Sequence, residues 1–343
     1  MTFVRYLCLG ALLVFGTSAQ CFDPAQQDDS LALVRHFKVP EKPLEMPEEG
    51  GLIGDDVGLT VSLMGGTDVF RMQEFGTFDF YLQVHAPDQY LRVRNLGWPG
   101  DTVYRQQRPM FFYTEEGDTR EGSEPDGREK IEPGVFVLSF GKMESLDGLE
   151  RLGEFEEAYD RLLAEFKKLT HRIALVEPVA FSRSGPAAEL AEERNEVLEK
   201  YTEVIEKLAA KRGVMLVRSD QVGDHPKFIE PTGIHLGYAA LQSQAFALVH
   251  QALGIKGIWN KHPGFGRDFP MLRDLIDEKN RLWDQYYRPT NWAFLYGDRQ
   301  HVPSSRDHKD SDRRWFIEEL NRIPGLISEK EEEIWAWAKE VEL

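Results

Sequence analysis

Short apolar segments alternate along the chain with longer stretches in which apolar residues recur at every third or fourth position. Five segments have the length and composition of buried strands: 59–64, 90–94, 134–140, 171–176 and 213–217. The clearest helical spacing between them covers 187–212. Strands that alternate with helices form a parallel sheet whose two faces are covered by helices. The pattern therefore predicts an α/β fold, a three-layer α/β/α sandwich with a central parallel sheet.

Helical spacing also covers 70–84, after the first strand, and 271–287 and 328–341 near the C-terminus. Most of the tryptophans fall in this last third of the chain: Trp259, Trp283, Trp292, Trp315, Trp335 and Trp337. We therefore predict a helical, aromatic-rich C-terminal extension over 256–343. Its aromatic side chains either pack helices onto the sheet, which is the preferred interpretation, or form a platform for sugar rings.

Three polar or broken segments lie outside these elements. Residues 114–133 contain eight Asp or Glu and three Lys or Arg, and 298–312 are also strongly polar. Both are predicted to be solvated loops. Residues 20–58 contain clustered Pro and Gly, which interrupt regular structure, and are predicted to be an N-terminal arm or linker. The sequence leaves open whether this arm packs on the domain or tethers it.

The first residues have the features of a processing signal. Arg5 precedes an apolar run over 6–15, and Thr17 and Ala19 are small residues at −3 and −1 of the expected cleavage point. We predict a signal peptide over 1–19 and an exported protein, periplasmic or extracellular. Cys21 leaves lipid anchoring as an alternative. No later apolar run reaches the roughly 20 residues of a membrane span.

The composition restricts the class of partner and cofactor. Of the 343 residues, 41 are Lys or Arg and 58 are Asp or Glu, so the formal net charge is −17. This acidic balance argues against nucleic acid and anionic membranes as main partners. The two cysteines cannot supply a disulfide framework or a multi-cysteine zinc site. No histidine pair has metalloprotease spacing and there is no P-loop, so neither a metal nor another cofactor is predicted.

Four short segments carry the candidate chemistry, and their positions along the chain are 63–68, 94–102, 139–145 and 231–236. The first three follow predicted strands, and the fourth opens a helix. In parallel sheets ligands bind at the carboxyl ends of the strands. We therefore expect these segments to meet at one edge of the sheet.

The order of these segments resembles that of the SGNH hydrolases, also called the GDSL esterase/lipase superfamily, over residues 59–255. The stretch 95–102, Asn-x-Gly-x-x-Gly-Asp-Thr, is similar to the second block of that family. The resemblance implies a flavodoxin-like sandwich, a backbone oxyanion donor at Gly100 and a catalytic histidine at His235. It is closest to exported bacterial members that carry a helical C-terminal extension.

Three positions depart from the family pattern. Thr67 replaces the nucleophilic serine, and its branched Cβ restricts the side chain. Met143 stands where an asparagine normally donates to the oxyanion, which a thioether cannot do. Thr232 occupies the position of the catalytic acid, for which Glu230 and, less directly, Asp298 are the remaining candidates.

These residues suggest two functions of different classes. The first is hydrolysis of an ester, with a small acyl group such as acetyl carried on a carbohydrate. Thr67 is then the nucleophile, His235 the general base and acid, and Gly100 an oxyanion donor. The alternative is a catalytically inactive protein with the SGNH fold that binds a ligand or serves as a scaffold.

Further residues of the same segments are expected at the substrate. Met143 and Trp98 are the predicted substrate-binding residues. Lys142 and Glu144 flank Met143, and two interpretations remain for them: contact with a polar ligand, or an ion pair at the surface that stabilises the fold little.

Overall fold

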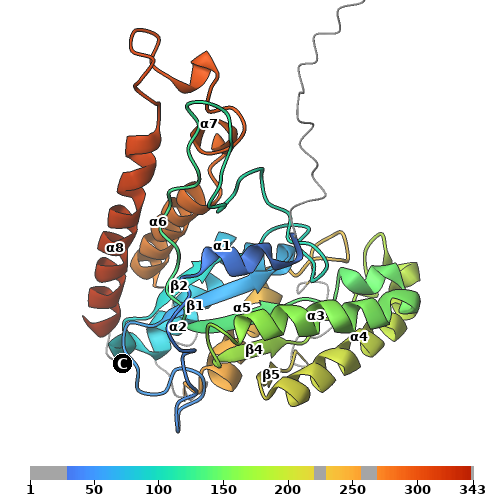
Figure 1. Ribbon diagram of the computed structural model, residues 1–343. Coiled ribbons are helices and arrows are strands. Elements are labelled where there is room, and N and C mark those ends of the chain that lie inside the picture. The colour runs from blue at the N-terminus through green and yellow to red at the C-terminus, as the bar shows by residue number, and fades with distance from the viewer. Residues whose placement is uncertain (1–28, 220–228, 256–268, 341–343) are drawn as a thin grey trace, which may run out of the picture.

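A parallel sheet forms the centre of the protein (Figure 1). The computed structural model describes residues 29–219, 229–255 and 269–340. Within them the strands are β1 (Thr60–Gly65), β2 (Arg92–Asn95), β3 (Val135–Ser139), β4 (Ile173–Val176) and β5 (Met215–Val217). They lie in the order β2-β1-β3-β4-β5, and all neighbouring strands are parallel. The predicted parallel sheet and its five strand segments are confirmed.

Helices form the two outer layers of the sandwich. The α-helices of the described residues are α1 (Thr67–Glu74), α2 (Thr77–His85), α3 (Leu152–Phe166), α4 (Ala191–Arg212), α5 (Tyr238–Ala247), α6 (Pro270–Tyr287), α7 (Trp292–Leu295) and α8 (Ile317–Glu340). A π-helical turn, Leu248–Ala252, continues α5. Short 3-10 segments cover Asp29–His36, Pro87–Gln89, Glu144–Asp147, Leu149–Arg151, Ala188–Leu190 and Pro303–Ser305.

Alternate residues of each strand face opposite layers, as the two-residue period of a strand requires. In β3, Phe136 and Leu138 pack with apolar residues of α3 and α4, whereas Val135 and Val137 pack with those of α1, α2 and α5. All four are buried. The sandwich therefore has two apolar cores, one on each face of the sheet.

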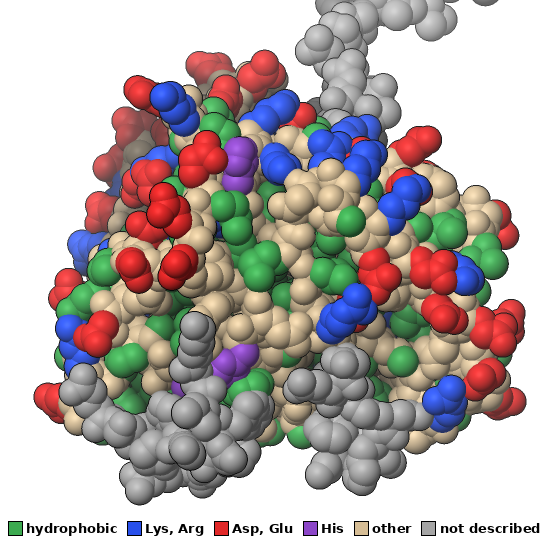
Figure 2. Space-filling model, turned by 90° about the horizontal axis from the view of Figure 1, so that it is seen from below, with side chains coloured by type: hydrophobic (Ala, Val, Ile, Leu, Met, Phe, Trp, Pro, Cys, Tyr) green, Lys and Arg blue, Asp and Glu red, His purple; other side chains and the backbone are tan. Residues whose placement is uncertain are grey.

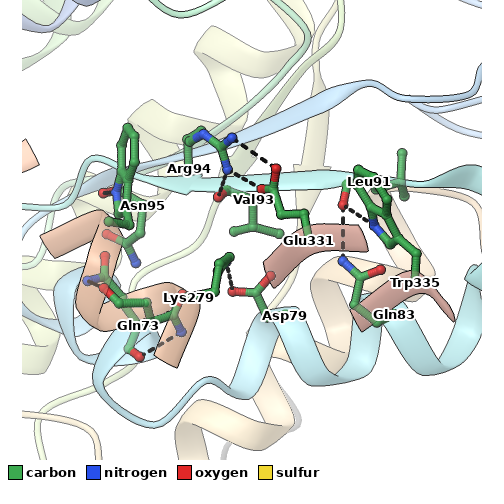
Figure 3. Close-up of polar contacts among 12 residues, drawn as sticks. Gln73, Asp79, Gln83, Leu91, Val93, Arg94, Asn95, Lys279, Glu331 and Trp335 are labelled. Carbon is green, nitrogen blue, oxygen red and sulfur yellow. Dashed lines mark hydrogen bonds and ion pairs between the residues drawn. The ribbon is translucent and has the colours of Figure 1, made fainter. Parts of the chain in front are cut away.

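The C-terminal helices α6 and α8 lie side by side next to β2, the edge strand of the sheet (Figure 1). Figure 3 shows how their side chains reach the strand and its flanking backbone. Glu331 of α8 forms an ion pair with Arg94, and the indole N–H of Trp335 donates to the Leu91 carbonyl at 3.3 Å. An exposed strand edge is a template for pairing with another chain. The helix pair covers this edge.

A second set of contacts joins α6 to the helices of the sandwich. Lys279 of α6 forms a buried ion pair with Asp79 of α2 at 2.8 Å. Beside it, the side-chain amides of Gln73 and Asn280 each donate to the other residue's backbone carbonyl, at 3.2 and 3.1 Å. These contacts make α6 part of the folded domain.

The described part of the N-terminal segment also packs on the domain. Leu33 and Phe37 belong to the core that contains α3, and Leu52 and Ile53 belong to the core of the opposite face. His36 is completely buried among the rings of Phe112, Tyr113 and Tyr287. Residues 29–58 therefore form a packed strap over the sandwich.

Several local expectations are wrong. One helix was predicted over 70–84, but the chain turns at Gly76, where φ is +58°, and forms α1 and α2. The last helix was predicted from 328, but α8 begins at Ile317. The segments 114–133 and 298–312, predicted to be solvated loops, are partly buried. The buried Gln300 exchanges hydrogen bonds with the backbone of Glu124, and so joins the two loops.

The acidic loop also contains a buried ion pair. Asp126 and Arg128 are linked at 2.7 Å, and both side chains are inaccessible to solvent. Arg128 donates in addition to the carbonyls of Tyr286 and Tyr287, at the end of α6. The charges of this segment therefore fasten the C-terminal extension to the sandwich, a role that composition alone does not reveal.

Two of the extension's tryptophans, Trp283 and Trp292, are buried in the same core as α3 and α4, as the packing interpretation requires. Trp259 and the predicted signal peptide lie outside the described residues. On the face seen in Figure 2, acidic side chains are spread widely and Lys and Arg lie among them. None of the helices in the described ranges is both long and apolar enough to cross a membrane.

We predict that Lys279→Met lowers the free energy of unfolding by about 3–5 kcal/mol, because it leaves the Asp79 carboxylate buried without its partner. The double variant Lys279→Met, Asp79→Leu removes both charges and should lose much less. Urea unfolding of the three proteins measures the difference. A double variant that is no more stable than Lys279→Met would contradict this account.

We also predict a dependence of stability on pH that involves His36. Burial, and then the charge of Arg108, hold the pKa of His36 well below its ordinary value of 6.5. The unfolded chain therefore binds a proton on this residue near pH 6.5 and the folded protein does not. Its contribution to stability is complete above pH 6.5 and is lost as the pH falls, by up to about 1.4 kcal/mol per unit. The loss of stability between pH 7 and 5 should be smaller in His36→Phe.

Candidate active site

The four segments singled out in the sequence meet at the carboxyl edge of the sheet. β1 lies between β2 and β3, so the connections that follow β1 and β3 leave toward opposite faces and open a crevice. A narrow pocket with about 40 Å³ of free space lies there. Its walls include Gly66, Thr67, Asp68, Lys142, Met143 and His235. The space is on the scale of a few water molecules.

The position of Thr67 depends on how closely β3 and α1 approach the end of β1. Gly65 has φ +154°, and a Cβ there would lie 2.4 Å from the Ser139 carbonyl oxygen and 2.7 Å from Val69 Cγ2. Only a glycine allows β1, β3 and α1 to come this close. Thr67 is therefore the first residue of α1, and its half-buried side chain lines the pocket.

Asp68 is the carboxylate that lies beside His235. Its Oδ1 atom is 3.9 Å from Nδ1 of the imidazole, which is within ion-pair range but longer than a hydrogen bond. The same oxygen accepts the Leu236 N–H at 3.0 Å. About a third of the His235 side chain, 32%, is exposed. Asp68 thus fixes the backbone that carries the histidine.

Arg71, one turn further along α1, holds the same loop. Its guanidinium donates to the Leu236 carbonyl at 3.1 Å and to Glu230 at 2.7 Å. Glu230 was the candidate to orient the imidazole, but its ion pair is with Arg71. Sequence reasoning missed Asp68 as the nearby acid. The available signal was its position directly after Thr67, at the start of the helix.

The loop with Gly100 is fixed by hydrogen bonds to β1 and within the loop. Gly100 has φ +88° and is exposed, in the left-handed region that favours glycine. The N–H of Trp98 donates to the Gly65 carbonyl at 3.0 Å, and the N–H of Asp101 donates to the Trp98 carbonyl at 3.0 Å. Asp101 also forms a buried, two-pronged pair with Arg108 at 2.8 and 2.9 Å.

The C-terminal extension holds the other end of this loop. The indole N–H of Trp283 and the guanidinium of Arg288 donate to the Asn95 carbonyl, at 2.8 and 3.0 Å. Arg288 also donates to the carbonyl of Gly97. The Asn95 side chain accepts the Gly97 N–H at 2.9 Å and donates to Val69 of α1. Asn95 thus links β2, α1, the loop and the extension.

The two predicted substrate-binding residues lie in different places. Met143 lines the pocket with Thr67 and is 37% exposed. Trp98 lines a second hollow of about 380 Å³, together with Arg288, Trp292 and Asp298. Asp298, a further candidate acid, therefore lines a different hollow from His235. The loop from Trp98 to Asp101 runs between the two spaces, because Asp101 lines the first.

Lys142 and Glu144 do not form the surface ion pair that was one interpretation of them. Glu144 is buried and accepts the N–H groups of Val103 and Gly141, each at 2.8 Å, and burial raises the pKa of its carboxyl. The Lys142 amino group is also buried, and among the described residues it has no hydrogen-bond partner. Burial lowers the pKa of Lys142.

In the described ranges, no three His, Cys, Asp or Glu side chains gather as a metal site requires. The groups that meet in the pocket are a hydroxyl, an imidazole, a carboxylate and an amine. This set can move a proton and hold a developing negative charge.

Comparison with known proteins gives resemblances at the level of structure. No family model matches the chain, and no curated protein matches it in sequence. An alpha/beta hydrolase from the metagenome of Lake Arreo, Spain, has 16% sequence identity and a TM-score of 0.44, over 59% of this chain and 98% of that one. The lipase/acylhydrolase from Enterococcus faecalis has 14% identity and a TM-score of 0.42, over 58% of this chain and 100% of that one.

An acetylxylan esterase from Geobacillus stearothermophilus is similar to the same degree. It has 16% identity and a TM-score of 0.43, over 60% of this chain and 97% of that one. Each of these matches spans nearly the whole of the other protein and leaves about two fifths of this chain unmatched.

We predict that Arg71→Met loosens the histidine-bearing loop while the domain stays folded. The change removes two hydrogen bonds to 230–236 and leaves Glu230 without its partner. Hydrogen exchange followed by mass spectrometry should show faster exchange in a peptide covering 229–237. Arg151→Met, at an exposed ion pair, is the matched control and should exchange like the parent. Equal exchange in both variants would contradict the role given to Arg71.

Proposed function

We propose that the protein is an ester hydrolase of the SGNH type with a threonine nucleophile. The observation that carries the proposal is the meeting of Thr67, His235 and Asp68 in one pocket at the carboxyl edge of the sheet. A nucleophilic hydroxyl, a base and an acid that faces the base are the groups that acyl transfer needs. The order of motifs in the sequence supports the same reaction.

In the first half of the reaction His235 takes the hydroxyl proton of Thr67 as the Thr67 oxygen attacks the ester carbonyl. The electron pair of the carbonyl double bond moves to the oxygen, and the Gly100 N–H donates to this oxyanion. When the intermediate collapses, the bond to the alcohol oxygen breaks and His235 gives it the proton. Water then attacks the acyl-threonine with His235 as base, and the bond to the Thr67 oxygen breaks. His235 returns the proton to this oxygen, which releases the carboxylic acid and regenerates the threonine hydroxyl.

Asp68 acts on the imidazole in this scheme. A carboxylate beside Nδ1 favours the tautomer whose Nε2 can accept a proton, and it stabilises the imidazolium that forms. Asp68 fixes the backbone at Leu236, and its carboxylate lies 3.9 Å from Nδ1, within ion-pair range of the imidazole. In this chain Asp68 takes the role of the acid that is missing at Thr232.

The substrate we propose is a small acyl ester carried on a carbohydrate. The narrow pocket favours a short acyl group such as acetyl over a long chain. The wider hollow on the other side of the Gly100 loop is lined by the half-buried Trp98, whose ring supports an aromatic contact with a sugar. We also propose that the protein is exported, on the basis of the sequence pattern over 1–19.

Two observations favour a second function, ligand binding without catalysis. Met143 cannot donate to an oxyanion, and the distance from Asp68 to His235 is longer than a hydrogen bond. A protein of this kind would bind a small polar ligand in the same pocket and leave it unchanged.

The test is hydrolysis of p-nitrophenyl acetate by the purified protein and by variants of Thr67 and His235. Thr67→Val keeps the branched shape and removes the hydroxyl, so turnover should be abolished. Thr67→Ser keeps the hydroxyl and removes the methyl group that crowds attack, so turnover should be equal or higher. His235→Gln should lose at least about 100-fold in kcat.

Circular dichroism and thermal unfolding check that each variant is folded. Equal turnover in the parent, Thr67→Val and His235→Gln would indicate non-specific surface catalysis and would contradict the proposal. Absence of turnover in the parent and in Thr67→Ser, with this ester and with an acetylated sugar, would favour the binding protein.

A further inference from the structure

The amino group of Lys142 is the polar group of the pocket that is least explained by the fold. It is buried, and among the described residues it forms no hydrogen bond. The group beside it is the ring of Phe181, whose centroid is 5.2 Å from Nζ. An ammonium without an acceptor is costly to bury. A fold that keeps it there has a place for an anionic or strongly polar oxygen nearby.

The loop that carries Lys142 is held firmly. Gly141 precedes it with φ +114°, and its N–H donates to Glu144, which also accepts the Val103 N–H. The next turn continues this order, because the Ser145 N–H donates to the Gly141 carbonyl at 3.0 Å. Lys142 therefore lines the same pocket as Thr67 and His235, from a fixed backbone.

Among the described residues, the acid Asp68 stabilises the charged form of Lys142. Burial lowers the pKa of Lys142, whereas the negative charge of Asp68 raises it. Asp68 is already used by the Leu236 N–H and faces His235. Within the part of the chain that the structure describes, the three ammonium protons therefore have no acceptor, and the side chain that carries them lines the pocket.

We propose that Lys142 is a catalytic residue whose ammonium group donates a hydrogen bond to the oxyanion of the tetrahedral intermediate. This inference rests on the proposed esterase function and concerns the same pocket. Met143 occupies the position of the missing donor and has none to give. The side chain before it supplies a charged donor in its place.

The role requires no transfer from Lys142. Attack by the Thr67 oxygen forms one bond to the carbonyl carbon and moves one electron pair to the carbonyl oxygen, while His235 holds the proton. The ammonium stabilises this negative charge and keeps its own protons throughout. Its contribution is larger in the transition state than with the neutral ester, so it should raise kcat more than it lowers KM.

The first measurement compares the parent with Lys142→Met, which removes the donor at similar length. With p-nitrophenyl acetate we expect kcat to fall by about 100- to 1000-fold and KM to change little. The melting temperature should stay equal or rise, because a buried, unpaired charge has been removed. Lys200→Met, at an exposed position of α4, is the matched control and should behave like the parent.

The second measurement does not depend on turnover. Methylphosphonate is a tetrahedral anion similar in shape to the intermediate, and calorimetry gives its affinity for the same three proteins. We expect binding to the parent and to Lys200→Met, and at least a tenfold weaker affinity for Lys142→Met.

The two measurements separate the failure of this inference from that of the esterase proposal. If the parent hydrolyses the ester and Lys142→Met has an unchanged kcat, Lys142 is not the donor. If the parent shows no turnover, the affinity for methylphosphonate tests the role of Lys142. Binding that depends on Lys142 keeps its role as an anion donor, and binding that is absent or unchanged overturns it.

Discussion

The hydrogen bonds of Asn95 hold together the parts of the protein that form the candidate site. Its carbonyl accepts hydrogen bonds from Trp283 and Arg288 of the extension, and its side chain bonds Gly97 and Val69. The end of β2, the start of α1 and the Gly100 loop are thereby fixed to one residue. The extension is therefore part of the support of the site, although its sequence lies far from the motifs.

The buried charges near the site differ in how they are held. Arg108 with Asp101, Arg128 with Asp126 and Lys279 with Asp79 are paired, and each pair joins segments of the fold or shapes a loop. Lys142 is different, because its amine has neither an ion pair nor a hydrogen bond among the described residues. Paired charges explain how the structure is held, and the unpaired charge indicates where a ligand can bind.

Periodicity was sufficient to predict the layers, because burial on both faces of a parallel sheet leaves a strong apolar pattern in each strand. It failed at 70–84, where Gly76 turns the chain although the apolar spacing continues. Charge composition wrongly predicted full solvation of 114–133. Asp126 and Arg128 neutralise each other in a buried ion pair, and Arg128 also donates to the end of the distant helix α6.

For the candidate site, the sequence indicated some of the residues but not the contacts between them. Motif order indicated Thr67 and His235, which line one pocket. The pairing of Glu230 with Arg71, and the approach of Asp68 to His235, depend on how α1 meets a loop about 160 residues further along the chain. Contacts of this kind leave no local pattern in a single sequence.

The cover on β2 has a consequence for the order in which the chain matures. The contacts that protect this strand join residues far apart in sequence, such as Arg94 with Glu331 and Leu91 with Trp335. During synthesis the edge of the sheet stays open until α8 has left the ribosome. Such distant contacts form late and slowly, and an open edge can pair with another nascent chain. Docking of α8 on β2 thus removes an edge that can aggregate from the time the sheet first forms.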